Sequence, residues 1–150
     1  MKLIKTCLIF NILFLSSTIQ PYCTKNPTIN TKYEFDTYID DFTFSPNGKY
    51  LAVLFWNNTL QIFDISIKNI SFKQEKKHVK LYKFSSDSKY LGIILWDGNF
   101  QLLDMQTEES LLDLGSVKNF KFSKSNNHIA MLFESNKPED KHIIEVFDIE

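Results

Sequence analysis

The sequence predicts an all-β protein built from three copies of one strand–turn–strand pattern. Aromatic residues make up 15% of the chain and include 14 Phe, and such side chains suit the half-buried surface of a sheet. Beyond residue 32 the apolar residues recur with a period near two, whereas a helix would space them at about 3.6 residues. The third observation, the internal repeat, is the strongest indication of the architecture.

The repeat is visible when three segments, each beginning with Phe-Ser, are superposed. They are FSPNGKYLAVLFWNNTLQIFD at 44–64, FSSDSKYLGIILWDGNFQLLD at 84–104, and FSKSNNHIAMLFESNKPEDKHIIEVFD at 122–148. The first two match without a gap at a spacing of 40 residues, and the third starts 38 residues later with six extra residues before its last strand. A period near 40 with four short strands per unit is typical of a propeller blade. We therefore expect a partial β-propeller of three four-stranded antiparallel blades.

Each element of the first copy has a local physical reason. Residues 44–49 (FSPNGK) end a strand in a turn, because Pro, Asn and Gly supply the backbone angles that tight turns require. Residues 50–55 are nearly all apolar, as in a strand covered on both faces. Asn57-Asn58, like Asp97-Gly98 in the second copy, is a hairpin dipeptide. A further strand follows and ends at Asp64.

Weaker strand candidates lie between the copies, and we group each with the copy that follows it. They are residues 33–35, 70–73 and 110–114. With this grouping the three repeats cover about 33–64, 70–104 and 110–148, which together span residues 33–150.

The N-terminus has the composition of an export signal. Residues 1–23 begin with lysines, continue with an apolar stretch at 7–15 and then carry small residues at 16–18, which is the order of a secretory signal peptide. The apolar stretch is shorter than the roughly 20 residues that a membrane-spanning helix needs, and the alternative is a buried first element of the domain. We expect a signal peptide at 1–23, a polar linker at 24–32, no stable membrane span, and a location outside the cell or in the secretory-pathway lumen.

Export would limit the covalent chemistry of the chain. If Cys7 leaves with the leader, the mature chain has at most one thiol, Cys23, and no internal disulfide can form. Cys23 could be lost with the leader, pair with another chain or stay free. Two acceptor sequons for N-glycosylation occur, at Asn57 and Asn69.

The repeats resemble the WD-repeat (WD40-like) β-propeller family. FSPNGKYLA resembles that family's FSPDGK-LA segment, and NNTLQIFD resembles its DGT-I-IWD hairpin. The resemblance covers about residues 33–150 and implies a propeller that acts as a protein-interaction module. The chain departs from the family at Phe63, Leu103 and Phe147, where members usually have Trp before the Asp, and no Gly-His dipeptide precedes any copy.

Composition and motifs favour a protein without enzymatic activity. With 17 basic and 18 acidic residues the net charge is −1, so the basic excess that nucleic-acid binding requires is missing. The histidines are isolated, at His78, His128 and His142. The sequence has no metal-ligand spacing and no phosphate-binding glycine loop. We predict no catalytic residues, no metal and no cofactor. Carboxylates recur at the end of each copy, where we expect a structural role, at Asp64, Asp104 and Asp148.

Two features are candidates for binding a protein partner. Trp56 and Trp96 occupy the same repeat position before the hairpin turn, and aromatic residues are common anchors in interfaces; the alternative is packing between blades. The insertion from Asn136 to Lys141 enlarges one hairpin loop, and insertions in repeats often map to the binding face; the alternative is a neutral surface loop.

These observations predict an exported, non-enzymatic protein-interaction or scaffold module with a protein partner. The alternatives are a structural half-propeller that completes a ring, by homodimerisation or with a partner, and a fragment of a larger propeller protein. Three blades leave apolar faces that need cover.

Overall fold

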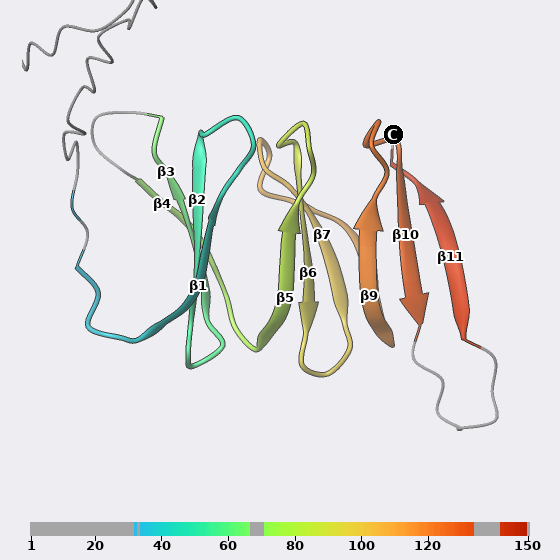
Figure 1. Ribbon diagram of the computed structural model, residues 1–150, viewed down its shortest axis with the longest axis horizontal. Coiled ribbons are helices and arrows are strands. Elements are labelled where there is room, and N and C mark those ends of the chain that lie inside the picture. Colours follow the sequence, from blue (N-terminus) through green and yellow to red (C-terminus); the bar gives the residue numbers. More distant parts are fainter. Residues whose placement is uncertain (1–31, 33, 67–70, 134–141, 150) are drawn as a thin grey trace, which may run out of the picture. The chain divides into compact units, whose positions relative to one another are not determined.

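The computed structural model describes residues 32, 34–66, 71–133 and 142–149, and every regular element within them is a β-strand (Figure 1). The chain divides into an N-terminal stretch, Met1–Glu34, and a compact unit, Phe35–Glu150, whose fold is described below. No helix of the described ranges has the length and apolar character to cross a membrane. The predicted leader, with Cys7 and Cys23, lies outside the described residues, as do residues 24–31 of the linker.

Within the described residues, eleven strands form three antiparallel sheets, each with its strands in chain order. The first sheet contains β1 (Ile39–Phe44), β2 (Tyr50–Phe55), β3 (Leu60–Asp64) and β4 (Ser71–Lys76). The second contains β5 (Val79–Phe84), β6 (Tyr90–Leu95), β7 (Phe100–Asp104) and β8 (Ser110–Leu114). The third contains β9 (Val117–Phe122), β10 (His128–Phe133) and β11 (Ile143–Asp148).

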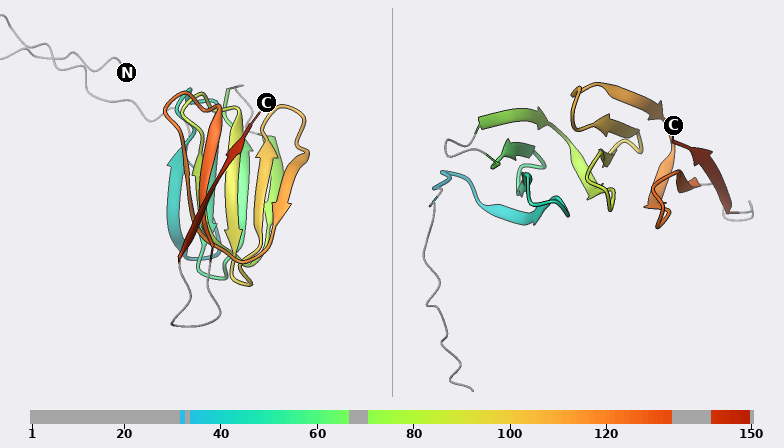
Figure 2. Two further views of the ribbon diagram at one scale, coloured as in Figure 1. Left: turned by 90° about the vertical axis from the view of Figure 1, so that its right-hand side faces the viewer. Right: turned by 90° about the horizontal axis from the view of Figure 1, so that it is seen from above.

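The three sheets follow one another side by side, as the view from above shows (Figure 2). The predicted all-β fold of three blade-like antiparallel sheets is confirmed, but the expected twelve strands and the grouping of the weak ones need correction. The segments expected at 70–73 and 110–114 pair with β3 and β7, so each closes the sheet before it rather than opening the next one. Glu34 and Phe35 form no strand, and in the described residues the third sheet has three strands.

The turn predicted from Phe-Ser-Pro-Asn-Gly-Lys recurs at the first bend of every sheet. Its last corner takes a positive φ in all three copies, at Gly48 (69°), Ser88 (65°) and Asn126 (61°). In the first copy the Gly48 N–H donates to the Ser45 carbonyl at 2.8 Å, which closes the turn. Gly and Asn tolerate this left-handed region, so the local sequence explains why two of the three corners form.

Two buried apolar clusters join the sheets in pairs. The first, between the first and second sheets, contains Ala52 and Leu54 of β2 together with Leu91 and Ile93 of β6. The second lies between the second and third sheets, and it contains Ile94 of β6 with, from the third sheet, Phe120, Ile129 and Met131. The strand β6 therefore buries one face against the first sheet and the other against the third. This is why residues 90–95 read as a continuous apolar run.

Polar side chains link the turns of neighbouring sheets. The Asn47 N–H donates to Ser88 Oγ at 3.0 Å. One repeat later, the Ser86 N–H donates to Asn126 Oδ1 at 2.9 Å. In both cases the side chain at the positive-φ corner of one sheet reaches back to the turn of the sheet before it. A repeated hydrogen bond of this kind fixes the spacing between neighbouring sheets.

Candidate functional site

The two tryptophans predicted to anchor a partner lie on one rim of the unit, at the hairpin turns β2–β3 and β6–β7 (lower edge in Figure 1). Trp56 is 72% exposed and Trp96 is 60% exposed, so neither ring is packed between sheets. The Tyr38 ring lies 5.9 Å from that of Trp56, and the Lys80 ammonium lies 5.5 Å from the centre of the Trp96 ring. Tyr38, Trp56 and Trp96 are called the aromatic rim below.

The backbone of the hairpin turns explains why the two rings project. Asn58 and Gly98 occupy the same turn position and both have positive φ, 61° and 85°. Their carbonyls accept hydrogen bonds from Val79 and Val117, the first residues of the next sheets, at 2.8 and 2.9 Å. The turn is thus anchored to the following sheet, and the residue before it points to solvent.

The other predicted surface residues are only partly described. Asn57 lies in the same turn as Trp56 and is exposed, as a glycosylation site requires, although its side-chain oxygen accepts the Thr59 N–H at 3.0 Å. Asn69 and the insertion from Asn136 to Lys141 lie outside the described residues.

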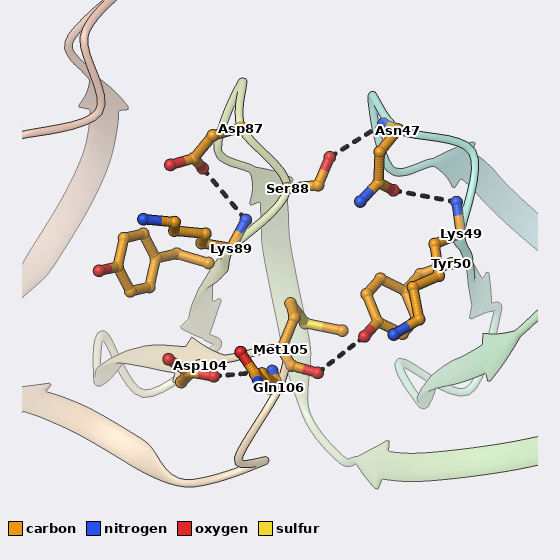
Figure 3. A pocket seen from close by; sticks show the side chains of 10 residues that line it. Asn47, Lys49, Tyr50, Asp87, Ser88, Lys89, Asp104, Met105 and Gln106 are labelled. Carbon is orange, nitrogen blue, oxygen red and sulfur yellow. Dashed lines mark hydrogen bonds between the residues drawn. The ribbon is translucent and has the colours of Figure 1, made fainter.

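A polar groove, which sequence reasoning missed, opens on the opposite rim between the first and second sheets (Figure 3). It has a volume of about 430 Å³. It is lined by Asn47, Lys49, Tyr50, Asp87, Ser88, Lys89, Tyr90, Asp104, Met105 and Gln106. In the groove the Tyr50 hydroxyl of the first sheet donates to the Met105 carbonyl, which follows β7 of the second sheet, at 3.0 Å. The groove therefore depends on both repeats, and no single motif in the sequence marks it.

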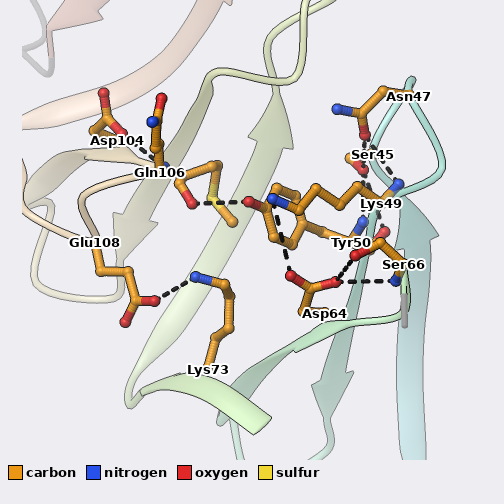
Figure 4. Close-up of polar contacts among 11 residues, drawn as sticks. Ser45, Asn47, Lys49, Tyr50, Asp64, Ser66, Lys73, Asp104, Gln106 and Glu108 are labelled. Atoms are coloured by element: carbon orange, nitrogen blue, oxygen red, sulfur yellow. Dashed lines mark hydrogen bonds and ion pairs between the residues drawn. The ribbon is translucent and has the colours of Figure 1, made fainter. Parts of the chain in front are cut away.

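The carboxylates around the groove are engaged in turns (Figure 4). Asp104 Oδ1 accepts the Gln106 N–H at 2.7 Å, and Asp64 Oδ1 accepts the Ser66 N–H at 2.9 Å. The Ser66 hydroxyl also donates to Asp64, and this hydrogen bond is the main cause that lowers the pKa of Asp64. The predicted structural role of Asp64 and Asp104 is confirmed: each holds the chain reversal after its strand.

The remaining predicted polar residues do not converge on a reactive centre. His128 Nε2 lies 3.1 Å from Asp148 Oδ1 across the β10–β11 pair. His78 has a positive φ of 59° in the link between β4 and β5. His142 is exposed at the start of the last described segment. In the part of the chain that the structure describes, no three His, Cys, Asp or Glu side chains are grouped to hold a metal.

The two outermost sheets each present an apolar face with no sheet against it in the described structure. In the first sheet Ala52 and Leu54 point to the second sheet, so the alternate residues of β2 point away from it. The first outer face comprises Phe42, Phe44, Leu51, Val53, Phe55, Gln61, Phe63, Phe72 and Glu75. Val53 and Phe55 are already buried, at 2% and 5% exposed. Phe42 is 63% exposed. Phe35 covers the part around Phe55, with ring centres 5.3 Å apart.

The last outer face lies on the third sheet and is smaller. Ile129 and Met131 point to the second sheet, so Ala130 and Leu132 point away from it. The last outer face comprises Asn119, Lys121, Ala130, Leu132, Ile144 and Val146. It contains a shallow hollow of about 210 Å³ between β9, β10 and β11.

Comparison with known structures identifies the fold as propeller-like. The chain is similar to the crystal structure of the Cps50 (Swd1) β-propeller domain of Myceliophteria thermophila, with a TM-score of 0.52 and 11% identity over 78% of this chain and 47% of that one. No protein-family model and no curated protein matches the sequence. The described sheets thus have a blade arrangement similar to that of this β-propeller domain, and the chain spans less than half of the domain's length.

Proposed function

We propose that this protein is an exported, non-catalytic interaction module that binds a protein partner through its aromatic rim. The observation that supports this proposal is the exposure of Trp56 and Trp96 at the same position of consecutive repeats. Large aromatic side chains are enriched at interface centres and depleted from surfaces that bind nothing. The two rings follow equivalent turns whose backbone is hydrogen-bonded to the next sheet, so this backbone needs little ordering when a partner binds.

The test is affinity capture from an extract of the source organism with three forms of the protein. The wild type is compared with Trp56→Ser/Trp96→Ser and with Leu111→Ser, a matched control in which an exposed apolar residue of β8 is removed away from the rim. A direct partner is captured equally by wild type and control and is reduced at least roughly tenfold by the double substitution, because truncation at a hot spot costs about 2 kcal/mol or more. Identical captured proteins in all three samples would contradict the proposal.

The sequon at Asn57 gives this test a second arm. A glycan on Asn57 would stand next to Trp56 and cover part of the aromatic rim. Protein produced with and without glycosylation should therefore differ in capture of the same partner, and Asn57→Gln should behave as the unglycosylated form in both hosts.

A second, structural function is favoured by the two outer faces. Contiguous exposed apolar surface is rare on monomers and marks a contact surface, and Phe42, Phe44 and Phe72 are each more than half exposed on one face. On this reading the chain is a part of a larger propeller, and its outer faces are covered by further blades.

A further inference from the structure

We propose that the first outer face of one copy docks on the last outer face of a second copy, with Phe42 seated in the hollow beside Ala130. This inference deepens the structural function above and rests on it. It names the partner as another molecule of the same chain and gives the register of the contact.

Two junctions within the chain show how one sheet packs on the next: the first junction lies between the first and second sheets, and the second junction lies between the second and third sheets. In the second junction the Phe120 ring lies against the backbone of Gly92, and a Cβ added to that glycine would stand 2.6 Å from Phe120 Cζ. In the first junction Tyr82 lies in the same buried cluster as Ala52. A small residue on the middle strand thus makes room for an aromatic ring from the first strand of the next sheet.

The aromatic residues of these junctions are equivalent by register as well as by sequence. Phe42, Tyr82 and Phe120 each lie two residues before the Phe-Ser pair of their repeat. Phe42 pairs with Val53, and Phe120 pairs with Met131 at the corresponding place. Tyr82 is 7% exposed and Phe120 is 1% exposed, whereas Phe42 is 63% exposed. Phe42 therefore corresponds to the two aromatic residues that pack on a preceding sheet, but in the described structure no sheet lies against it.

The small residue against which a ring packs also occurs in all three copies, but only the first two copies have a ring packed there in the described structure. Ala52, Gly92 and Ala130 occupy the same place in the three copies, eight residues after the Phe of Phe-Ser. Ala130 lines the hollow on the last outer face together with Leu132 and Ile144. The third sheet therefore offers the small residue and the space that the first two sheets use to accept a ring.

A lysine beside the hollow extends the correspondence. In the second junction the Lys83 ammonium lies 5.6 Å from the centre of the Phe120 ring. Lys121 holds the position of Lys83 in the third copy and lines the hollow. A ring of Phe42 seated there would meet the same cation above its face, an arrangement that stabilises aromatic contacts.

The contact between copies would lack polar contacts that the internal junctions contain. Phe42 has no hydroxyl to match that of Tyr82, which in the first junction donates to Asp41 Oδ2 at 3.0 Å; Phe120 in the second junction has none either. Gly48 has no side chain where Ser88 and Asn126 reach back to the preceding turn. We therefore expect association to be reversible, with the same apolar packing as the internal junctions but weaker positioning.

A second copy is the occupant that these observations favour, because both halves of the complementary pair belong to one sequence. The contact joins two different faces, and such head-to-tail contacts close into rings when the rotation between subunits allows it. Two copies would bring six blades together, within the usual range of about four to eight for a propeller.

The experiment is cross-linking between two single-cysteine variants of the full chain, in a background with Cys7→Ala and Cys23→Ala. One variant carries Phe42→Cys and the other Ala130→Cys, and a short bismaleimide reagent is added to each alone and to their mixture. Head-to-tail docking places residue 42 of one copy beside residue 130 of the other, so a cross-linked dimer should form in the mixture and in neither single sample. Leu111→Cys mixed with Ala130→Cys is the matched control and should remain uncross-linked.

Every other outcome overturns the inference. Cross-linking within either single-variant sample would show that like faces meet, and a mixture without cross-linked dimer would show that these faces do not meet. In the second case, Phe42→Glu is tested in the capture experiment. If Phe42→Glu no longer captures a partner, the structural function stands, with a different protein bound at the outer face. If capture is unchanged, the outer faces support neither the structural function nor the docking of two copies.

Discussion

The substitution Gly92→Ala tests how closely the second and third sheets are packed. The added Cβ would stand 2.6 Å from Phe120 Cζ, closer still to Phe120 Cε2, and 3.2 Å from Phe100 Cε2. The Phe120 ring cannot swing away freely, because its centre lies 5.0 Å from that of Phe100 and 5.7 Å from that of Phe122. Alanine at this position therefore forces the two sheets apart or strains the aromatic cluster.

The magnitude follows from two opposing effects. Overfilling a packed core costs about 1–3 kcal/mol. Replacing glycine with alanine also restricts the unfolded chain, which stabilises the protein by about 0.4–1 kcal/mol. The free energy of unfolding of Gly92→Ala should therefore fall by about 1–2 kcal/mol.

The assay is urea denaturation followed by circular dichroism, with Gly115→Ala as control. A Cβ at Gly115 would meet only Asn99 Oδ1, at an ordinary contact distance of 3.5 Å, so this variant should be as stable as the wild type or slightly more stable. In the double variant Gly92→Ala/Phe120→Leu the smaller side chain relieves the clash, and its loss should be less than the sum of the two single losses. An unchanged Gly92→Ala protein with strictly additive effects would refute the packing argument.

The remaining predictions concern the polar links between sheets. Tyr82→Phe removes the hydrogen bond to Asp41 and should lower the free energy of unfolding by about 1 kcal/mol at neutral pH. Burial, helped by that hydrogen bond, raises the pKa of Tyr82. Above about pH 10 the tyrosine therefore ionises in the unfolded chain first, and stability should fall by up to about 1.4 kcal/mol per pH unit. Urea titrations between about pH 9 and pH 11 should show a shallower decline for Tyr82→Phe, and equal slopes would contradict this assignment. Asn126→Gly should cost about 1 kcal/mol through the lost contacts with Ser86, and Asn126→Ala about 1 kcal/mol more because φ is 61° at this corner; the reverse order in thermal denaturation would show that the corner is not strained.

Much of the fold could be predicted because its causes are local. The corner at Gly48 and the hairpin at Asn58 follow from residues that tolerate positive φ, and both formed where the sequence placed them. The assignment of β4 and β8 to sheets could not be predicted in this way. The sequences of β4 and β8 are weakly apolar, so local preference does not say which sheet they join. That is decided by the backbone hydrogen bonds that they make with β3 and β7.

The candidate surfaces differ in the same way: those marked by local sequence could be predicted, and those formed by distant segments could not. Trp56 and Trp96 were identified because their positions repeat, and exposure on one rim is consistent with the binding role proposed for them. The polar groove was missed because it forms only when the turn at Asn47 meets that at Met105 in the next repeat. The need to cover the outer faces was predicted from the number of blades, but the residue that marks the first face was not identified: Phe42 aligns with Tyr82 and Phe120, which are buried, and is itself 63% exposed.

The most direct test of the account is the solution mass of the full chain, measured by light scattering over a range of concentrations. Complementary outer faces predict a species of about 35 kDa, twice the 17.6 kDa of one chain, which Phe42→Glu shifts to the single-chain mass while the circular dichroism spectrum stays unchanged. A wild-type protein that stays soluble at the mass of one chain at every concentration would contradict the claim that the first outer face of one copy docks on the last outer face of another.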